Sequence, residues 1–322
     1  MNDTANPRIW RDAPAARVRP AEAPTAVTIG NFDGVHRGHQ HVLKRAVDVG
    51  SEYGLPVIAV TFDPHPLVVL APDHAPARLT TLERRIELLH ASGAEVVYVL
   101  AFSEDMAGWS PQEFIDRVLI EQLRAQQVIV GQNFRFGHKA AGDIDVLKDQ
   151  GATHGFEVTG LELTGASAVN SPAPYSSTLV RRLVGGGDLP AASQVLGRPH
   201  EVCGHITRGD GRGRDLGFPT ANMPVDESYA VPPDGVYAGW LVTQDGRRLA
   251  NAISVGTNPT FRGVERRIES YAIDQSGLDL YGTYVRVEFI EQLRPMQSFD
   301  SVDDLVAQMA DDVDTARAVL ES

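Results

Sequence analysis

The sequence predicts two domains: a doubly wound parallel α/β sheet in the N-terminal part, and a small antiparallel β barrel or sandwich with a C-terminal helix. Three observations lead to this fold class. The chain has 322 residues, which is more than one domain usually contains. Residues 25–165 alternate apolar runs with helical patterns, whereas the chain beyond residue 185 is richer in Gly and Pro and alternates apolar with polar residues. We therefore expect one domain at 1–185 and a second at 186–322.

The N-terminal domain is expected to contain parallel strands joined by helices. The expected strands are short runs rich in Val and Ile, at 26–30, 55–62, 95–100, 127–131 and 156–163. Thr80–Glu83 and Ser110–Glu113 are typical of the capping boxes that begin helices, and Pro111 fits a first helical position. The residues before the first strand are expected to be a loose lead-in. Ligands of such a sheet bind beyond the carboxyl ends of its strands.

The C-terminal domain begins after Gly185–Asp188, which leads into a short helix. The stretch 240–255 predicts a hairpin that turns on Asp245 and Gly246. Residues 268–274 and 283–290 alternate as half-buried strands do. Apolar residues then recur at helical spacing from Ser301 to Leu320, and Ser301 with Asp304 forms a capping box.

Composition excludes several classes of protein. Lys and Arg number 29 against 42 Asp and Glu, a net charge of −13, so the chain lacks the basic surplus of a nucleic-acid binder. Free nucleotides need only a few local donors. Cys203 is the one cysteine, which excludes a disulfide framework and a Cys-rich zinc module. Apolar runs such as Val96–Phe102 are too short to cross a bilayer, and we expect a cytoplasmic protein without a membrane partner.

A candidate phosphate-binding turn follows the first expected strand. Residues 30–39 read GNFDGVHRGH and lead into an apolar helical pattern. The glycines allow backbone N–H groups to approach a ligand, and a helix N-terminus carries a positive partial charge. His36 and His39 are one helical turn apart, so both can reach the phosphates of a nucleotide. The other candidate nucleotide-binding residues are Gly30, Asn31, Phe32, Asp33 and Gly34.

Two simpler interpretations compete for this turn. His-x-x-His can bind zinc, although no Glu or Cys stands nearby at ligand spacing. The glycines can also simply shape a strand–helix turn, with both histidines in solvent. The sequence has no Walker A pattern, and the turn does not match G-x-G-x-x-G, which excludes a P-loop and a Rossmann fingerprint.

Two other segments are expected to belong to the same site. Residues 130–137 follow another strand end, where Phe134 and Phe136 could line a planar ring. Three hydroxyl residues at 176–178 precede a helix with Arg181 one turn in, and could form a second wall around phosphates. The hydroxyl residues are equally typical of a helix N-cap.

A second candidate site lies in the C-terminal domain. Residues 208–217 contain four glycines and three arginines, which could fold over a polyphosphate. Thr220 and Asn222 follow and offer the oxygen ligands that Mg²⁺ prefers. Partial burial of Glu269 on the strand 268–274 would raise its pKa and make it a general base for a hydroxyl. Surface loops also collect Gly and Arg, and a solvated carboxylate explains Glu269 equally well.

These motifs occur in one order along the chain: GNFDGVHRGH, FDPHP, GQNFRFG, SSTLVR, GRDLGFPTAN, GVYAGW, VGTNPTF and IESYAID…LYG. Together they resemble the bacterial bifunctional riboflavin kinase/FMN adenylyltransferase (FAD synthetase) family. The resemblance covers residues 25–320. It implies a C-terminal β-barrel kinase that phosphorylates riboflavin to FMN, and an N-terminal nucleotidyltransferase domain that joins ATP to FMN, giving FAD and pyrophosphate.

The resemblance also implies cofactors and partners. Mg²⁺ would act in both domains, with ATP as co-substrate and no tightly bound prosthetic group required. The small-molecule partners would be riboflavin, FMN, FAD, ATP, ADP and pyrophosphate. Self-association is left open.

Individual residues receive roles from the same resemblance. The catalytic residues would be His36, His39, Arg181 and Glu269. The histidines would stabilise charge at the α-phosphate, the arginine would assist from the other wall, and the glutamate would act as the kinase base. Further phosphate-binding residues would be Ser176, Ser177 and Thr178 in the adenylyltransferase, and Gly209, Gly211, Gly213, Gly217 and Pro219 in the kinase. Flavin would contact Phe62, Asn133, Phe134 and Phe136, and the metal would contact Thr220 and Asn222.

The chain departs from the family pattern near the expected flavin site. Many members carry an acid where Asn133 stands and an Arg a few residues after FRFG, where this chain has HKAA at 138–141. Two alternatives of other kinds are a nucleotidyltransferase for another phosphorylated acceptor, and a flavin-binding regulatory protein without catalysis. GFPTAN with Glu269 argues against the first, and the intact candidate catalytic residues argue against the second.

Overall fold

The computed structural model describes residues 8–11, 21–162, 165, 174–209, 213, 216–226, 228–260 and 263–321. The chain forms two compact units. The second comprises Ser176–Ser322 together with the segment Ala77–Thr80, and the first comprises the other described residues before Ser176. Helix α7 (Ser177–Gly185) is part of the second unit, whereas the predicted domain limits include it in the first domain. The domain limits at 185 and 186 stay a prediction.

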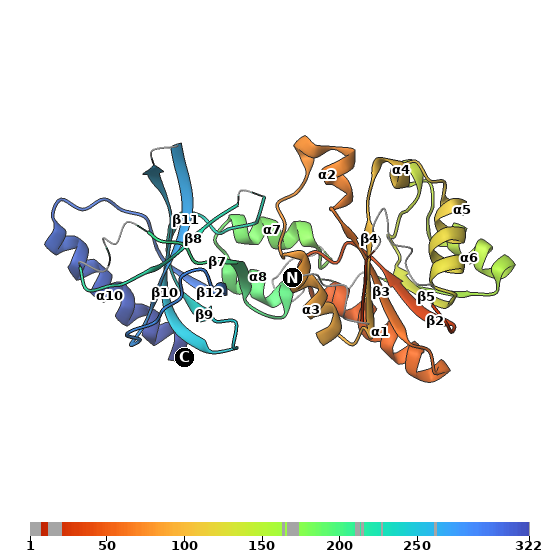
Figure 1. Cartoon of the computed structure of the whole chain (residues 1–322), viewed down its shortest axis with the longest axis horizontal. Helices are drawn as coiled ribbons and strands as arrows, with labels where there is room; N and C mark the ends of the chain where they lie inside the picture. Colours follow the sequence, from red (N-terminus) through yellow and green to blue (C-terminus); the bar gives the residue numbers. More distant parts are fainter. Residues whose placement is uncertain are drawn as a thin grey trace. The chain divides into compact units, whose positions relative to one another are not determined.

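The sheet of the first unit is parallel throughout its described strands, in the order β1-β4-β3-β2-β5-β6. Figure 1 labels its strands β2, β3, β4 and β5. The strands are β1 (Ile9–Arg11), β2 (Thr25–Ile29), β3 (Val57–Asp63), β4 (Val96–Ala101), β5 (Ala125–Gly131) and β6 (Glu157–Leu161). The chain moves outward from β2 through β3 to β4, and β5 then pairs with the other side of β2. This reversal creates a topological switch between β2 and β5, where doubly wound sheets bind their ligands.

The five strands expected in this unit are confirmed, and β1 is an additional one. Ile9–Arg11 pairs in parallel with β4, and Trp10 packs edge-on against Tyr98 at 6.3 Å between ring centroids. The expectation of a loose lead-in is therefore wrong for these residues, because pairing with an existing sheet edge stabilises a strand too short to predict by itself.

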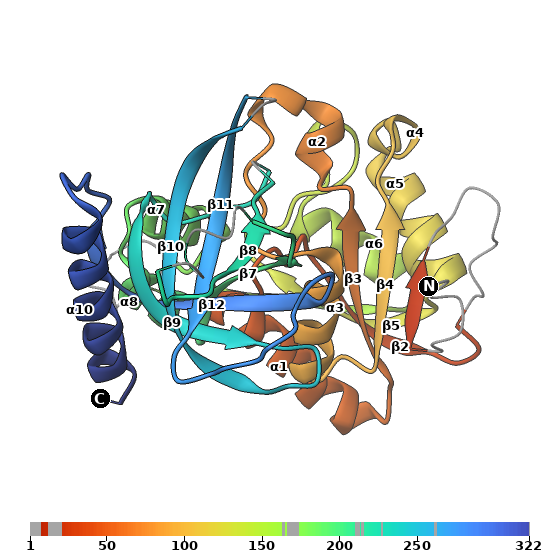
Figure 2. The same cartoon turned by 60° about the vertical axis from the view of Figure 1, so that its left-hand side comes forward.

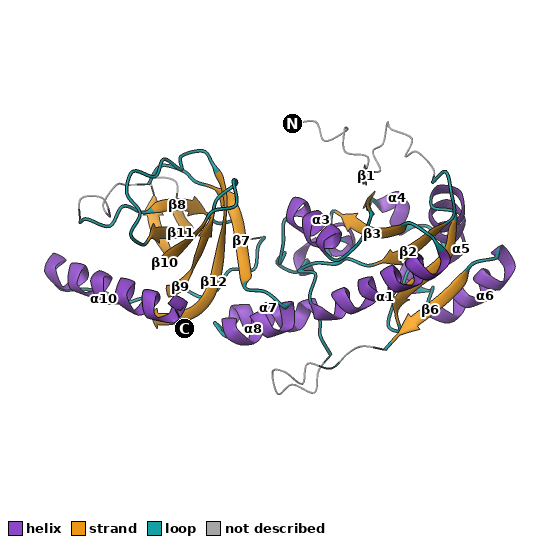
Figure 3. Ribbon diagram, turned by 90° about the horizontal axis from the view of Figure 1, so that it is seen from below, coloured by secondary structure: helices purple, strands orange, loops and turns teal. Residues whose placement is uncertain are grey.

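Helices cover both faces of this sheet (Figure 3). They are α1 (Arg37–Tyr53), α2 (Pro66–Leu70), η1 (Pro72–His74), α3 (Leu82–Ala91), α4 (Glu104–Ala107), α5 (Pro111–Phe114), η2 (Ile115–Gln122), η3 (His138–Ala140) and α6 (Ile144–His154). The capping box at Ser110 is confirmed, with Pro111 in the first turn. The box at Thr80 is wrong by one residue, because the hydroxyl of Thr81 accepts the Arg84 N–H at 3.1 Å and thereby caps α3.

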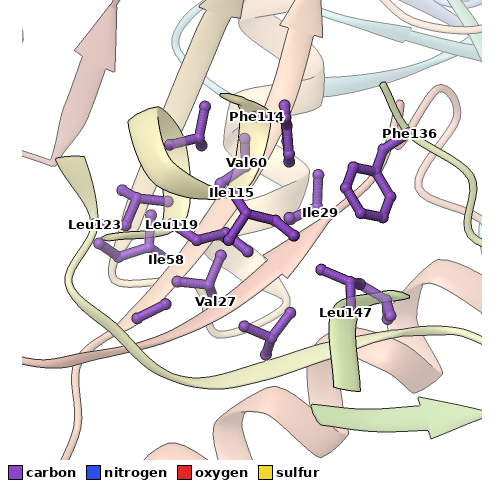
Figure 4. Packing of buried hydrophobic residues seen from close by; sticks show 14 of the residues in the cluster. Val27, Ile29, Ile58, Val60, Phe114, Ile115, Leu119, Leu123, Phe136 and Leu147 are labelled. Atoms are coloured by element: carbon purple, nitrogen blue, oxygen red, sulfur yellow. The ribbon is translucent and has the colours of Figure 1, made fainter. Parts of the chain in front are cut away.

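The core of this unit follows from the alternation of side chains along its buried strands. Val27 and Ile29 of β2 pack with residues of α5, η2 and α6 on one face (Figure 4). Ala26 packs with residues of α1 on the opposite face. The sheet is thus fixed from both sides, and the loops at its carboxyl ends start from rigid strands.

The second unit contains an antiparallel sheet whose described strands run in the order β7-β12-β9-β10-β11-β8. They are β7 (His200–His205), β8 (Ala221–Pro224), β9 (Gly235–Val242), β10 (Arg248–Thr260), β11 (Gly263–Ala272) and β12 (Tyr284–Pro295). An antiparallel bridge between Thr207 and Asn222 links the ends of the sheet. The result is a nearly closed barrel, which settles the choice between barrel and sandwich. The predicted hairpin turn is confirmed, with Gly246 at φ 86° between β9 and β10.

Helices α7, α8 (Leu189–Leu196) and α10 (Val302–Glu321) complete the second unit. Helix α10 packs along β9 and β10 (Figure 2), and Ser301 accepts the Asp304 N–H as its predicted cap. The segment Ala77–Thr80 adds to this unit through Arg78. Its backbone bridges Tyr229 in parallel, and its guanidinium lies 4.4 Å from the centroid of the Tyr229 ring.

Candidate active sites

The turn after β2 has an unusual backbone that is held by its own apolar residues. Phe32, Gly34 and Val35 all have positive φ, at 49°, 81° and 38°. Only Gly adopts this region at no steric cost, so Phe32 and Val35 store strain. Both side chains are almost fully buried in a core cluster that also contains Leu43 of α1. Packing therefore imposes the shape of the turn, and Phe32 lies in the core at this predicted nucleotide-binding position.

The two histidines of the turn lie face to face. His36 is the N-cap of α1, and its Nδ1 accepts the His39 backbone N–H at 3.3 Å. The two rings stack with centroids 3.6 Å apart and planes inclined by 21°. The first turn of α1 contains no acidic residue, so the positive partial charge of the helix N-terminus is available to an anion. The predicted proximity of His36 and His39 is confirmed.

His39 is kept neutral by its surroundings. Burial, the neighbouring His36 and the charge of Arg85 all lower its pKa, in that order of importance. Its Nδ1 is buried and has no hydrogen-bond partner among the described residues. Because His36 Nδ1 accepts a hydrogen bond, the neutral His36 ring carries its proton on Nε2. That N–H is a donor suited to a phosphate oxygen.

The remaining predicted residues of this turn differ in exposure, and their nucleotide contacts stay predictions. Asn31 is exposed at the start of the turn, and its side-chain amide lies 3.3 Å from His65 Nε2. Asp33 is 2% exposed. A Cβ on Gly30 would lie 3.2 Å from the Phe32 ring, so the absence of a side chain at Gly30 lets this ring lie close to the backbone. His65 belongs to the FDPHP motif, and no spacing in the sequence predicts its contact with Asn31.

Aromatic residues meet where β3 and β5 end. Phe134 stacks on Phe136 at 5.5 Å between centroids, and Phe62 meets Phe102 edge-on at 6.0 Å. Phe136 lies in the core, whereas Phe62 and Phe134 are partly buried at the edge of the same cluster. Asn133 is exposed beside them. Phe62 and Phe134 thus pack against the same apolar cluster, to which Phe136 itself belongs, and the flavin contacts predicted for these residues and for Asn133 stay predictions.

The hydroxyl residues at 176–178 belong to the second unit. Ser176 caps α7 by accepting the Leu179 N–H at 3.2 Å, and Ser177 and Thr178 occupy the first turn. The Nε of Arg181 donates to the backbone oxygen of Ala77. The N-cap interpretation is confirmed for Ser176, and the predicted phosphate-binding role of these residues stays a prediction.

The second candidate site forms on the outside of the barrel. Asn222 of β8 and Glu269 of β11 are paired opposite each other. The hydroxyl of Thr220 donates to a carboxylate oxygen of Glu269 at 3.4 Å, and the Asn222 amide donates to the backbone oxygen of Thr220 at 3.3 Å. Ile268 and Ser270 are buried, so alternation directs Glu269 away from the barrel interior. The three residues predicted for this site are therefore neighbours.

Two glycines of the segment 208–217 lie close to this site. A Cβ on Gly209 would lie 2.4 Å from the Asn222 amide nitrogen, and a Cβ on Gly213 would lie 2.4 Å from the backbone oxygen of Phe218. Gly217 has φ 87°, and Pro219 is exposed. Gly211 lies outside the described residues. Close backbone approach explains Gly209 and Gly213 without a ligand, so their predicted phosphate contacts stay predictions.

The largest omission from the sequence-based site is Arg85 of α3. It is 2% exposed, and its Nη1 donates to the backbone oxygens of Asn31 and Phe62. It also donates to the Thr61 hydroxyl, and all three partners are far from Arg85 in the sequence, so they leave no mark in the local pattern of residues. Among the described residues, no group of three or more His, Cys, Asp and Glu side chains is placed to hold a metal ion.

Comparison with known proteins places both units in one family. A model described as FAD synthetase matches residues 18–170, and one described as riboflavin kinase matches residues 196–320. The bifunctional riboflavin kinase/FMN adenylyltransferase of Escherichia coli (strain K12) is 37% identical over 291 residues, covering 90% of this chain and 91% of its own length. The protein of the same name from Bacillus subtilis (strain 168) is 33% identical over 305 residues, covering 92% of each.

A solved structure resembles the chain over most of its length. It is described as a macrolide-efflux protein from Streptococcus pneumoniae, with a TM-score of 0.82, 30% identity, and coverage of 92% of this chain and 95% of its own. In the described part of the present chain, no helix is both long and apolar enough to cross a membrane.

Proposed function

Because the chain belongs to the bifunctional riboflavin kinase/FMN adenylyltransferase family, we propose that its two units carry the two reactions which this name describes. The second unit phosphorylates riboflavin to FMN, and the first joins FMN to ATP. One observation carries the proposal: each unit has its own cluster of side chains suited to phosphoryl chemistry, at His36 and His39 in one and at Thr220, Asn222 and Glu269 in the other. The proposed limits of the two domains are 1–185 and 186–322.

In adenylyl transfer, a phosphate oxygen of FMN attacks the α-phosphorus of ATP. The bond from that phosphorus to the bridging oxygen breaks, and pyrophosphate leaves with the electron pair. His36 donates its Nε2–H to a phosphate oxygen, and the turn after β2 and the N-terminus of α1 stabilise charge on the phosphates. Arg181 and the hydroxyls of 176–178 are proposed to assist. The flavin ring would contact Phe62 and Phe134, with Asn133 beside them and Phe136 behind them.

In the kinase reaction, Glu269 takes the proton of the riboflavin 5′-hydroxyl. The hydroxyl oxygen bonds to the γ-phosphorus of ATP as the bond to the β-phosphate oxygen breaks, and ADP leaves. Positioning and charge stabilisation supply most of the rate in such a transfer. Backbone N–H groups of Gly209, Gly211, Gly213 and Gly217, with Pro219 fixing the turn, are proposed to hold the ATP phosphates.

Mg²⁺ fits the donors of the second unit. The Thr220 hydroxyl and the Asn222 amide oxygen are hard ligands, and they adjoin the Glu269 carboxylate. A bound ion would neutralise part of the charge on the ATP phosphates. We also propose that the enzyme acts in the cytoplasm, where ATP is available, and that ADP and pyrophosphate are its by-products.

The test is incubation of the purified protein with riboflavin, ATP and Mg²⁺, followed by chromatography of the flavins. We expect FMN to appear first and FAD to follow. Absence of both products would overturn the proposal. Omitting Mg²⁺ and adding a chelator should stop FMN formation, which tests the metal.

Two variants test the assignment of residues. His36→Ala should accumulate FMN without FAD, because it removes the phosphate donor of the first unit. Glu269→Gln should leave riboflavin unphosphorylated while supplied FMN is still adenylated. His41→Ala is the matched control, since His41 is an exposed histidine of the same helix α1. Loss of both activities in a folded His36 or Glu269 variant would contradict the two-site division.

A further inference from the structure

A buried arginine lies directly beneath the histidine turn. Arg85 projects from α3, and its Nη1 donates to the Phe62 oxygen at 2.9 Å, the Thr61 hydroxyl at 3.1 Å and the Asn31 oxygen at 3.2 Å. Thr61 also donates its hydroxyl hydrogen to the Asn31 oxygen, at 3.0 Å. Hydrogen bonds of Arg85 and Thr61 therefore connect the end of β3 to Asn31, the residue that follows Gly30.

Asn31 is the residue directly before the strained part of the turn. The next residue, Phe32, already has positive φ, and Gly34 and Val35 follow with the same sign. A strained backbone conformation persists only where several contacts of the surrounding structure hold it in place. Phe32 and Val35 are held by the core from one side, and the Asn31 carbonyl is held by Arg85 and Thr61 from the other.

The position of this turn sets the position of the stacked rings. His36 ends the turn, and the His39 N–H binds His36 Nδ1. Movement of the Asn31 carbonyl therefore shifts the turn, the N-cap and the two imidazoles together. The charge of Arg85 also contributes to the lowered pKa of His39, after burial and His36.

We propose that Arg85 is a positioning residue for adenylyl transfer, which acts on the reacting phosphates through the Asn31 carbonyl and the histidine turn. The proposal rests on the proposed function of the first unit. Arg85 itself does not touch ATP. It holds the turn in the one arrangement that places the His36 donor and the N-terminus of α1 around the phosphates.

The test compares Arg85→Met, Arg85→Lys and Arg84→Met in the full-length chain, with FMN, ATP and Mg²⁺. Arg84 is the matched control, because it is the adjacent arginine of α3 and pairs with Glu87 at 2.7 Å. A displacement of about 1 Å at a reacting group costs on the order of 100-fold in rate, so Arg85→Met should lower kcat for FAD formation by about 10- to 100-fold. The KM for FMN should change by less than about threefold, because the aromatic cluster at the ends of β3 and β5 is kept.

Arg85→Lys should keep most of the activity that Arg85→Met loses. A role of Arg85 in packing alone would not distinguish these two variants. The three hydrogen bonds to Phe62, Thr61 and Asn31 all come from one nitrogen, and a Lys ammonium also offers three donors from one nitrogen. Arg85→Lys should therefore recover to within about fivefold of the wild-type kcat, whereas Met, which fills similar volume, should not. Arg84→Met should stay within about twofold.

Thr61→Val is a second test of the same contact, which remains informative if Arg85→Met fails to fold. It removes the second donor to the Asn31 oxygen without removing a charge, and it should lower kcat by about three- to tenfold. Circular dichroism and thermal unfolding establish that each variant is folded. A folded Arg85→Met with wild-type kcat, an equal loss in Arg84→Met, or wild-type kcat in Thr61→Val would each overturn the proposal. If the wild-type chain makes no FAD, the proposed function has failed instead.

Discussion

At the scale of single residues, the stacked histidines depend on small neighbours. Gly38 lies in the first turn of α1, where a Cβ would stand 3.1 Å from His36 Nδ1 and 3.2 Å from the Cβ of Tyr175. Both distances are tighter than ordinary van der Waals contact. A side chain at position 38 would therefore press on the His36 ring from within the same helical turn.

The first prediction concerns this glycine. Gly38→Ala should reduce FAD formation by about tenfold, because the added methyl group displaces the His36 imidazole from its stacked position. The rate of FAD formation from supplied FMN and ATP is measured by chromatography of the flavins. Gly185→Ala is the control, since no atom lies within 4 Å of a Cβ there. Unchanged FAD formation in Gly38→Ala would show that the ring position does not limit the reaction.

The second prediction concerns the stability of the first unit at different pH. Since the pKa of His39 is lowered in the folded chain, the unfolded state binds more protons as the pH falls below its ordinary value of 6.5. The contribution of His39 to stability is therefore complete above that pH and declines below it. Urea unfolding at about pH 7.5 and about pH 5.5 should show a larger loss of stability for the wild type than for His39→Gln. Equal losses would contradict the lowered pKa of the His39 imidazole.

The sequence allowed much of the candidate site to be predicted where its chemistry depends on side chains near one another in the chain. His36 and His39 share a helical turn, and Asn222 stands two residues from Thr220, so spacing alone brought each pair together. Arg85 could not be found this way, because the backbone oxygens of Asn31 and Phe62 could come from any residue, and the Thr61 hydroxyl is far from Arg85 in the sequence. Phe32 shows the converse: its position in the motif suggested a ligand contact, and its strained, buried conformation serves the core.

At the scale of elements, a largely buried ion pair joins α10 to the barrel, in which the Arg294 side chain is 17% exposed. Arg294 of β12 donates from Nε and Nη2 to the two carboxylate oxygens of Asp312, at 2.8 and 2.7 Å. Asp312 is 7% exposed, and it also accepts from Gln308 at 3.1 Å. A bidentate geometry of this kind fixes the rotation of the helix on β9 and β10.

The third prediction concerns this pair. Asp312→Ala should lower the free energy of unfolding by about 2 kcal/mol, because it leaves the largely buried Arg294 charge without its partner. Asp311→Ala on the exposed side of α10 should cost less than about 0.5 kcal/mol. Urea unfolding of the full-length variants compares them. A cost for Asp312→Ala no larger than for Asp311→Ala would contradict the inferred role of the pair.

The elements differ in how well the sequence predicts them. Long apolar runs such as β3 and β5 are fixed by local pattern. Ile9–Arg11 is a strand only because the edge of β4 is available, and such a non-local cause is absent from the local sequence. The cap of α3 falls on Thr81 and not Thr80, because two adjacent threonines offer the same hydroxyl and packing decides between them.

At the scale of the whole molecule, the charge of the chain is unevenly distributed. The net charge of −13 is concentrated partly in residues 300–322, which carry seven acidic residues and Arg317. The segment 208–217, in contrast, carries three arginines among its glycines. This local basic charge favours a small anionic ligand at the barrel and fits the proposed ATP site, while overall acidity disfavours nucleic acid.

The central claim is that two separate sites perform consecutive reactions linked by free FMN. The most direct measurement mixes equal amounts of His36→Ala and Glu269→Gln proteins with riboflavin, ATP and Mg²⁺ and follows the flavins by chromatography. Neither variant alone should make FAD from riboflavin, whereas the mixture should, because FMN from the first protein is adenylated by the second. A mixture that yields FMN but no FAD, although Glu269→Gln still adenylates supplied FMN, would contradict the account.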